Sequence, residues 1–121
     1  MIENRLFHRV RFAAKAILTH DNAASEGDLE NISLNGAMLS FNNPPLLLPE
    51  DECSLAITLD DDLPPMQFAV EIVHCGHTMI GLKFIAMEAE TRERLCKLME
   101  RVTSEPEKLK GELSRFTPAK P

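Results

Sequence analysis

Two stretches in the middle of the chain, 53–59 and 66–72, are apolar at every second residue. Successive side chains of a β-strand point to opposite faces, so this period indicates strands with one face in a core. Segments rich in proline and polar residues, 42–45 and 60–65, interrupt the chain before each of them. The chain must therefore bury these apolar faces in a sheet.

Weaker signals predict the remaining strands. Residues 11–20 alternate loosely and end at Asp21-Asn22, which is a turn sequence. Two short runs, 28–33 and 36–41, meet at the segment 33–36, where Asn35 and Gly36 suit a positive φ. A hairpin turn around 75–77 leads into a last strand over 78–85.

After Ala86 the apolar period changes from two to three and four residues, which predicts an amphipathic helix at about 88–102. A second helix is expected from Ser104, because Ser104 and Glu107 form a capping box and Pro106 suits a first turn. Its apolar face could pack on its own barrel or on another subunit. This face consists of Leu109, Leu113 and Phe116.

Five or six short strands followed by one or two helices predict a mainly β fold, an antiparallel sheet curled into a small barrel with helices packed outside. A chain of 121 residues is the size of one domain and can bury a core without disulfides or metals. We expect a barrel domain over 1–103, with a flexible arm at 1–10, and a helical extension over 104–121.

The charges are divided unevenly along the chain. The first 20 residues hold Arg5, Arg9, Arg11 and Lys15 against Glu3, whereas residues 21–82 contain no Lys or Arg and eleven acidic residues. The net charge of -6 argues against binding of nucleic acid or anionic membrane by the whole surface. The arginines could form a local cationic site, or could pair with the acidic residues.

Other features exclude several classes of protein. The three cysteines lie far apart without a Cys-x-x-Cys pair, which favours a reducing compartment. Cys53 and Cys96 fall on apolar stripes and are expected in the core. We see no signal peptide, no membrane span and no metal pattern, and we predict a cytoplasmic protein.

Two short motifs stand at the start of the predicted sheet. Arg5 and Arg9 form Arg-x-x-x-Arg before the first strand, and Asn31, Ser33 and Gly36 form Asn-x-Ser-x-x-Gly about 20 residues later. Together with Gly81-Leu-Lys-Phe84, they resemble the PilZ domain family, which binds the bacterial second messenger cyclic di-GMP. The resemblance covers roughly residues 4–102. It implies a six-stranded antiparallel β-barrel with a helix after the last strand.

The resemblance also implies roles for these residues. Arg5 and Arg9 would bind phosphate or the O6/N7 edge of guanine from the flexible arm. Arginine suits both tasks, because its planar guanidinium donates two hydrogen bonds in parallel and can stack on a purine. Asn31 would hydrogen-bond a guanine edge, and Ser33 a phosphate or base. Gly36 would let the backbone approach closely or hold a strained turn.

Three further residues bear on the predicted site. Many family members have Asp where this chain has Asn31, and Asp accepts better from guanine N–H groups, so Asn31 predicts a lower affinity. His74 could stack on a base, or could be an exposed side chain beside the hairpin turn. Arg11 could face the ligand or an acid such as Glu30, and we leave it outside the site.

The main hypothesis is a bacterial cyclic di-GMP receptor that signals by altered docking on an unidentified partner protein. The alternative is an adaptor with the same fold and little or no nucleotide affinity. We expect no enzyme, because the sequence has no nucleophile–base pair, no phosphate loop with Lys and no Glu/His set at metal spacing. The absence of Trp and Tyr and the acidic remainder argue against RNA binding.

Overall fold

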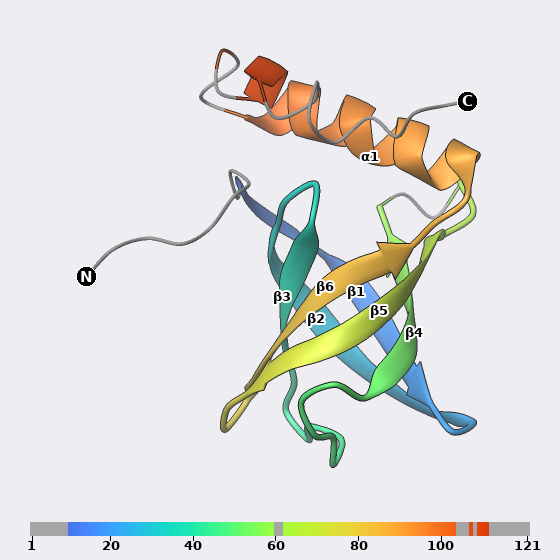
Figure 1. Ribbon diagram of the computed structural model, residues 1–121, viewed down its shortest axis with the longest axis vertical. Helices are drawn as coiled ribbons and strands as arrows, with labels where there is room; N and C mark the ends of the chain where they lie inside the picture. The colour runs from blue at the N-terminus through green and yellow to red at the C-terminus, as the bar shows by residue number, and fades with distance from the viewer. Residues whose placement is uncertain (1–9, 60–61, 104–106, 108, 112–121) are drawn as a thin grey trace.

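The computed structural model describes residues 10–59, 62–103, 107 and 109–111, with side chains from residue 13 onward. Six antiparallel strands close into a barrel in the order β1-β2-β3-β6-β5-β4 (Figure 1). Strand β1 closes the barrel because it pairs with both β2 and β4. The elements are β1 (Val10–His20), β2 (Ala23–Ile32), β3 (Gly36–Ser40), β4 (Glu52–Thr58), β5 (Met66–Cys75), β6 (Met79–Ala86) and α1 (Ala89–Val102).

This architecture confirms the predicted six-stranded barrel with a helix after the last strand. The expected β1–β2 turn is also present, since Asp21 and Asn22 have φ of 51° and 70°. Two positive φ values in a row match the right-handed twist of the flanking strands and close a tight hairpin. His20 pairs with Ala23 directly beside this turn.

Two strands are longer than their apolar pattern predicts. Strand β2 begins at Ala23 rather than at residue 28, and its first half has no alternating apolar residues. Pairing with β1 keeps this half extended as the second arm of the hairpin. Strand β5 continues past Ile72 to Cys75, where β6 supplies its partners.

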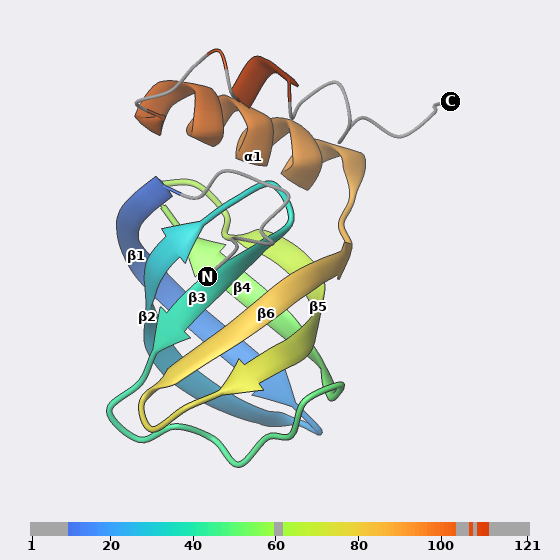
Figure 2. The ribbon, with the colours of Figure 1, turned by 60° about the vertical axis from the view of Figure 1, so that its left-hand side comes forward.

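Helix α1 covers one open end of the barrel (Figure 2). Its apolar stripe is buried against the interior, with Leu95, Leu98 and Met99 at most 2% exposed. The helix contacts β1 and β5. The barrel interior and the underside of α1 therefore form one continuous core.

The described part of the predicted second helix is helical, at Glu107 and at residues 109–111. Leu109 is 2% exposed and belongs to the core cluster, so at this residue the segment packs on its own fold. The other residues on which this prediction rests, Ser104, Pro106, Leu113 and Phe116, lie outside the described part of the chain.

None of the helices in the described residues is both long and apolar enough to span a bilayer.

Replacing Leu109 with Ala tests whether the segment after α1 is part of the folding unit. Removing a buried leucine side chain leaves a cavity, so we expect the free energy of unfolding to fall by about 2–5 kcal/mol. Urea denaturation of the full chain measures this loss. The neighbouring Lys110 is exposed, and Lys110→Ala should change stability by less than about 0.5 kcal/mol. Equal, small effects of both substitutions would contradict the packing of Leu109.

Candidate functional site

A β-bulge in β2 determines which way Asn31 faces. The pairing of β2 with β3 shifts register between Leu29 and Asn31, so Glu30 is the extra residue. Without this shift, strict alternation from Leu29 would turn Asn31 toward the core and Ile32 outward. With it, Ile32 is 0% exposed in the core, and Asn31 pairs with Met38 on the outer face.

Strand register places Asn31 in a row that crosses five strands. Asn31 pairs with Arg11 of β1 and with Met38 of β3, Met38 pairs with Gly81 of β6, and Gly81 pairs with His74 of β5. Residues that pair directly across strands share a face of the sheet. By backbone pairing this outer row runs through Arg11, Asn31, Met38, Gly81 and His74, and the described side chains on its outer face are those of Asn31, Met38 and His74.

The side-chain oxygen of Asn31 is buried and has no hydrogen-bond partner among the described residues. The neighbouring Glu30 carboxylate is itself an acceptor and cannot donate to this oxygen, and its Oε2 accepts from the Ser40 hydroxyl at 2.6 Å. Burying a polar atom without a hydrogen-bond partner typically costs about 1–3 kcal/mol of free energy relative to leaving it in water. A ligand with an N–H donor at this point would satisfy it.

Ser33 builds the turn that follows Asn31. Its hydroxyl accepts hydrogen bonds from the backbone N–H groups of Asn35 and Gly36, both at 3.1 Å, and donates to Gly36 O at 3.3 Å. The Ser33 N–H also donates to Gly36 O at 2.9 Å. Ser33 is 3% exposed, so one short side chain satisfies the polar groups of a buried turn.

The structure corrects one reason given for Gly36. The predicted positive φ at Asn35 and Gly36 is wrong, since the described residues with positive φ are Asp21, Asn22 and Glu50. The requirement for glycine comes instead from close approach of β3 to β6. A Cβ at Gly36 would overlap the Leu82 carbonyl oxygen and would lie 3.1 Å from the Lys83 Cα.

Gly81 lies in the middle of the outer row and has no side chain to cover the surface there. A Cβ there would meet the Met38 methyl and the His74 Cβ, each at 3.5 Å, which is ordinary contact. The absence of a side chain thus leaves a low, apolar step between Met38 and the exposed His74. Three residues later Phe84 fastens the turn, because its N–H donates to Asn35 O at 2.8 Å.

The arginines of the first motif, Arg5 and Arg9, lie outside the described residues, as does most of the predicted arm at 1–10. The described chain begins at Val10, which pairs with Ile32, one residue from Asn31. The register described above places Asn31 and His74 on the outer surface of the barrel, on strands separated by β3 and β6. Met38 was missed by the sequence analysis, although its position two residues after Gly36 in a strand is a usable signal.

The cysteines have no evident part in this site. All three are free. Burial, together with the nearby Asp51 and Asp21 carboxylates, raises the pKa of the Cys53 thiol to about 11. Burial also raises the pKa of Cys96. Both thiols remain protonated at neutral pH and behave as apolar groups, as predicted for Cys53 in the core and Cys96 packed against it.

Comparison with known proteins gives this architecture a family. The profile of the PilZ domain matches residues 3–101. The chain therefore belongs to the PilZ domain family, a family of cyclic di-GMP receptors that are typically non-catalytic. A search of curated protein sequences found no match.

Solved structures share the fold. The PilZ domain of YcgR from Escherichia coli, solved with c-di-GMP, is 12% identical with a TM-score of 0.68, over 93% of this chain and 98% of that one. The K. pneumonia MrkH–c-di-GMP complex is 17% identical with a TM-score of 0.69, over 94% and 56%. Bacillus subtilis MotI/DgrA is 13% identical with a TM-score of 0.69, over 83% of this chain. This chain spans only 51% of MotI/DgrA, and at these identities the likeness concerns the fold alone.

Gly36→Ala and Gly81→Ala form a matched pair that tests the close approach of β3 to β6. Both glycines are buried and lie on paired strands. At Gly36 the added methyl group displaces backbone, so the free energy of unfolding should fall by about 1–3 kcal/mol, while Gly81→Ala should change it by less than about 0.5 kcal/mol. Urea denaturation measures both values. A Gly36→Ala variant as stable as the wild type would refute the packing argument.

Proposed function

We propose that the protein is a cyclic di-GMP receptor that binds the dinucleotide between Arg5 and Arg9 of the N-terminal segment and the outer row at Asn31. The supporting observation is the buried side-chain oxygen of Asn31, which has no hydrogen-bond partner among the described residues. The backbone of Asn31 pairs with that of Arg11 on β1. The N-terminal segment joins β1 one residue earlier, at Val10. The complexes of YcgR and MrkH with c-di-GMP support the same class of ligand.

Asn31 would recognise guanine. Guanine presents N–H donors beside its O6 acceptor, and the Asn31 Oδ1 can accept from such a donor while its amide donates in return. Because this oxygen is already buried and has no partner in the described part of the chain, the new hydrogen bond would not require it to leave water. The contact would therefore favour guanine over a base without a donor at that position.

Arg5 and Arg9 would supply positive charge that residues 21–82 lack. Residues 21–82 contain no Lys or Arg, so the two phosphates of the ligand need cations from outside this segment. Arg9 directly precedes the first described residue, Val10, which pairs with Ile32. The planar fork of Arg9 can hold a phosphate or a guanine edge bidentately.

Ser33 and Gly36 contribute by holding the turn next to Asn31. The Ser33 hydroxyl already makes three hydrogen bonds within the turn, so a direct contact with phosphate or base would exchange one of them. Gly36 keeps β3 close to β6 and so fixes the distance from the turn to Phe84. Both residues act on the ligand through the position of the backbone.

The remaining part of the row would receive the flat face of a base. Met38 and Gly81 form a low apolar step, and the exposed His74 ends it on β5. An aromatic imidazole can stack on a purine, and the methionine thioether contacts aromatic rings favourably. Binding would order the N-terminal segment over this row and remake the adjacent surface, which changes docking on a partner protein.

Calorimetric titration of the full chain with cyclic di-GMP, beside Arg9→Ala, tests this function. Loss of one bidentate contact of about 1–3 kcal/mol should weaken binding by about 5- to 150-fold. Lys15→Ala is the matched control, because Lys15 lies on β1 and pairs with the exposed Asp28 at 3.5 Å. It removes the same charge six residues further along the chain, and its affinity should stay within about twofold of the wild type.

Two results would contradict the proposal. If the Arg9→Ala variant binds the ligand with wild-type affinity, Arg9 is not part of the binding site. An absence of binding by the wild type would leave the barrel as a protein-binding adaptor with the family fold.

A further inference from the structure

The loop between β3 and β4 lies at the end of the barrel opposite α1 (Figure 2), and two of its leucines are exposed. In this loop, residues 42–51, Leu46 is 99% exposed and Leu48 is 70% exposed, while Leu47 between them is 8% exposed. The adjoining strand β5 adds Val73, which is 55% exposed. Single exposed leucines are ordinary, but two that flank a buried one form a local apolar surface.

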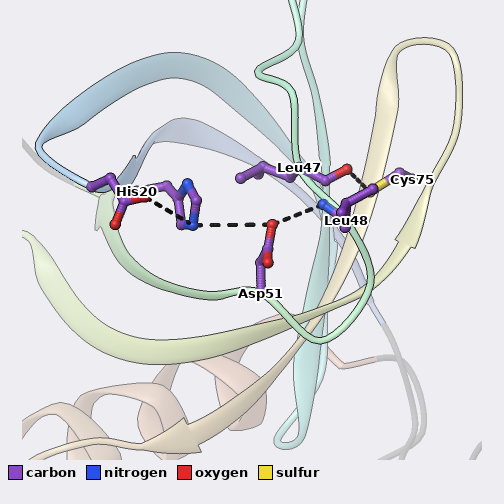
Figure 3. A network of polar contacts seen from close by, with 6 residues as sticks. His20, Leu47, Leu48, Asp51 and Cys75 are labelled. Carbon is purple, nitrogen blue, oxygen red and sulfur yellow. Dashed lines mark hydrogen bonds and ion pairs between the residues drawn. The ribbon is translucent and has the colours of Figure 1, made fainter.

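The 42–51 loop is fastened along β5. The Glu50 N–H donates to Ile72 O at 2.7 Å, and the Ile72 N–H donates to Asp51 O at 2.8 Å. At the other end of the contact, the Cys75 thiol donates to Leu47 O at 3.3 Å (Figure 3). Val73 lies between these two attachment points, so the loop and this part of β5 form one surface.

Asp51 fixes the local shape that displays Leu48. Its carboxylate accepts from the Leu48 N–H at 2.9 Å, and its own N–H donates to Leu48 O at 3.1 Å. The same carboxylate lies 4.0 Å from His20 Nε2 at the end of β1 (Figure 3). The leucines are thus presented from a preorganised loop, and little further ordering would be needed when a partner binds.

The charged groups around this surface are acidic. Glu50 and Asp51 belong to the loop, Glu52 begins β4, and Asp21 lies 3.8 Å from His20 Nε2. The sequence places no Lys or Arg anywhere in residues 21–82, which include the loop and the adjoining end of β5. A partner must therefore match an apolar centre and a negative rim.

We propose that the 42–51 loop is a docking surface for a protein segment that carries Lys or Arg beside apolar side chains. A second copy of the same face would place acidic groups against acidic groups, and an anionic membrane would be repelled in the same way. The proposal does not depend on nucleotide binding, because Leu46 and Leu48 lie outside the outer row. The two surfaces adjoin on β5, where Val73 is next to His74.

Selection from a random peptide library displayed on phage, with the full-length protein as target, tests this proposal. We expect the selected peptides to combine Lys or Arg with Leu, Ile or Phe, and their affinity should fall as salt is raised. In Leu46→Ser/Leu48→Ser their affinity should fall at least tenfold. The matched control is Leu63→Ser, which replaces another exposed leucine, 53% exposed, outside this loop and should bind as the wild type does.

Several results would overturn the proposal. One is the selection of acidic or uncharged peptides, and another is that the selected peptides bind the double variant as tightly as the wild type. A third is self-association of the wild type in sedimentation velocity that the double variant loses. Wild-type binding to vesicles of phosphatidylcholine and phosphatidylglycerol that depends on both leucines would make the surface a membrane contact instead. Titration of the double variant with cyclic di-GMP, which should be unchanged, separates a failure here from a failure of the nucleotide site.

Discussion

The bulge at Glu30 is the constraint on which the candidate site depends. It moves Ile32 into the core and leaves Asn31 on the outer face, two residues before Ser33, which holds the turn. Bulges are common where a sheet must aim a side chain at a ligand. Here the energy of burying Ile32 fixes the direction of a polar group that has no partner among the described residues.

The barrel carries two kinds of surface. From the β2–β3 turn to His74 on β5, the outer row presents an acceptor without a partner among the described residues and a flat apolar step, which suit a purine nucleotide. At the end of the barrel opposite α1 (Figure 2), the 42–51 loop presents leucines within an acidic rim, which suits a basic protein segment. The two surfaces use different side chains, so one rigid barrel can carry both.

The sequence predicts the barrel well because its strands bury one face and its turns use residues with special backbone preferences. Asp21-Asn22 adopts the positive φ that its composition suggests, and α1 follows the apolar period. Pattern alone could not predict the bulge at Glu30, because it comes from the register of β2 with β3. The need for glycine at position 36 was likewise assigned to a positive φ, because the residue that it contacts, Leu82, is distant in the sequence. Met38 joins the site only through its pairing with Asn31.

Amide hydrogen exchange of the full chain, with and without saturating cyclic di-GMP, tests the central claim most directly. If the N-terminal segment closes over the outer row, exchange should slow at residues 3–11 and around the turn at 31–38, and should stay unchanged in the 42–51 loop. Equal exchange at residues 3–11 in both states, although the ligand is bound, would contradict the account.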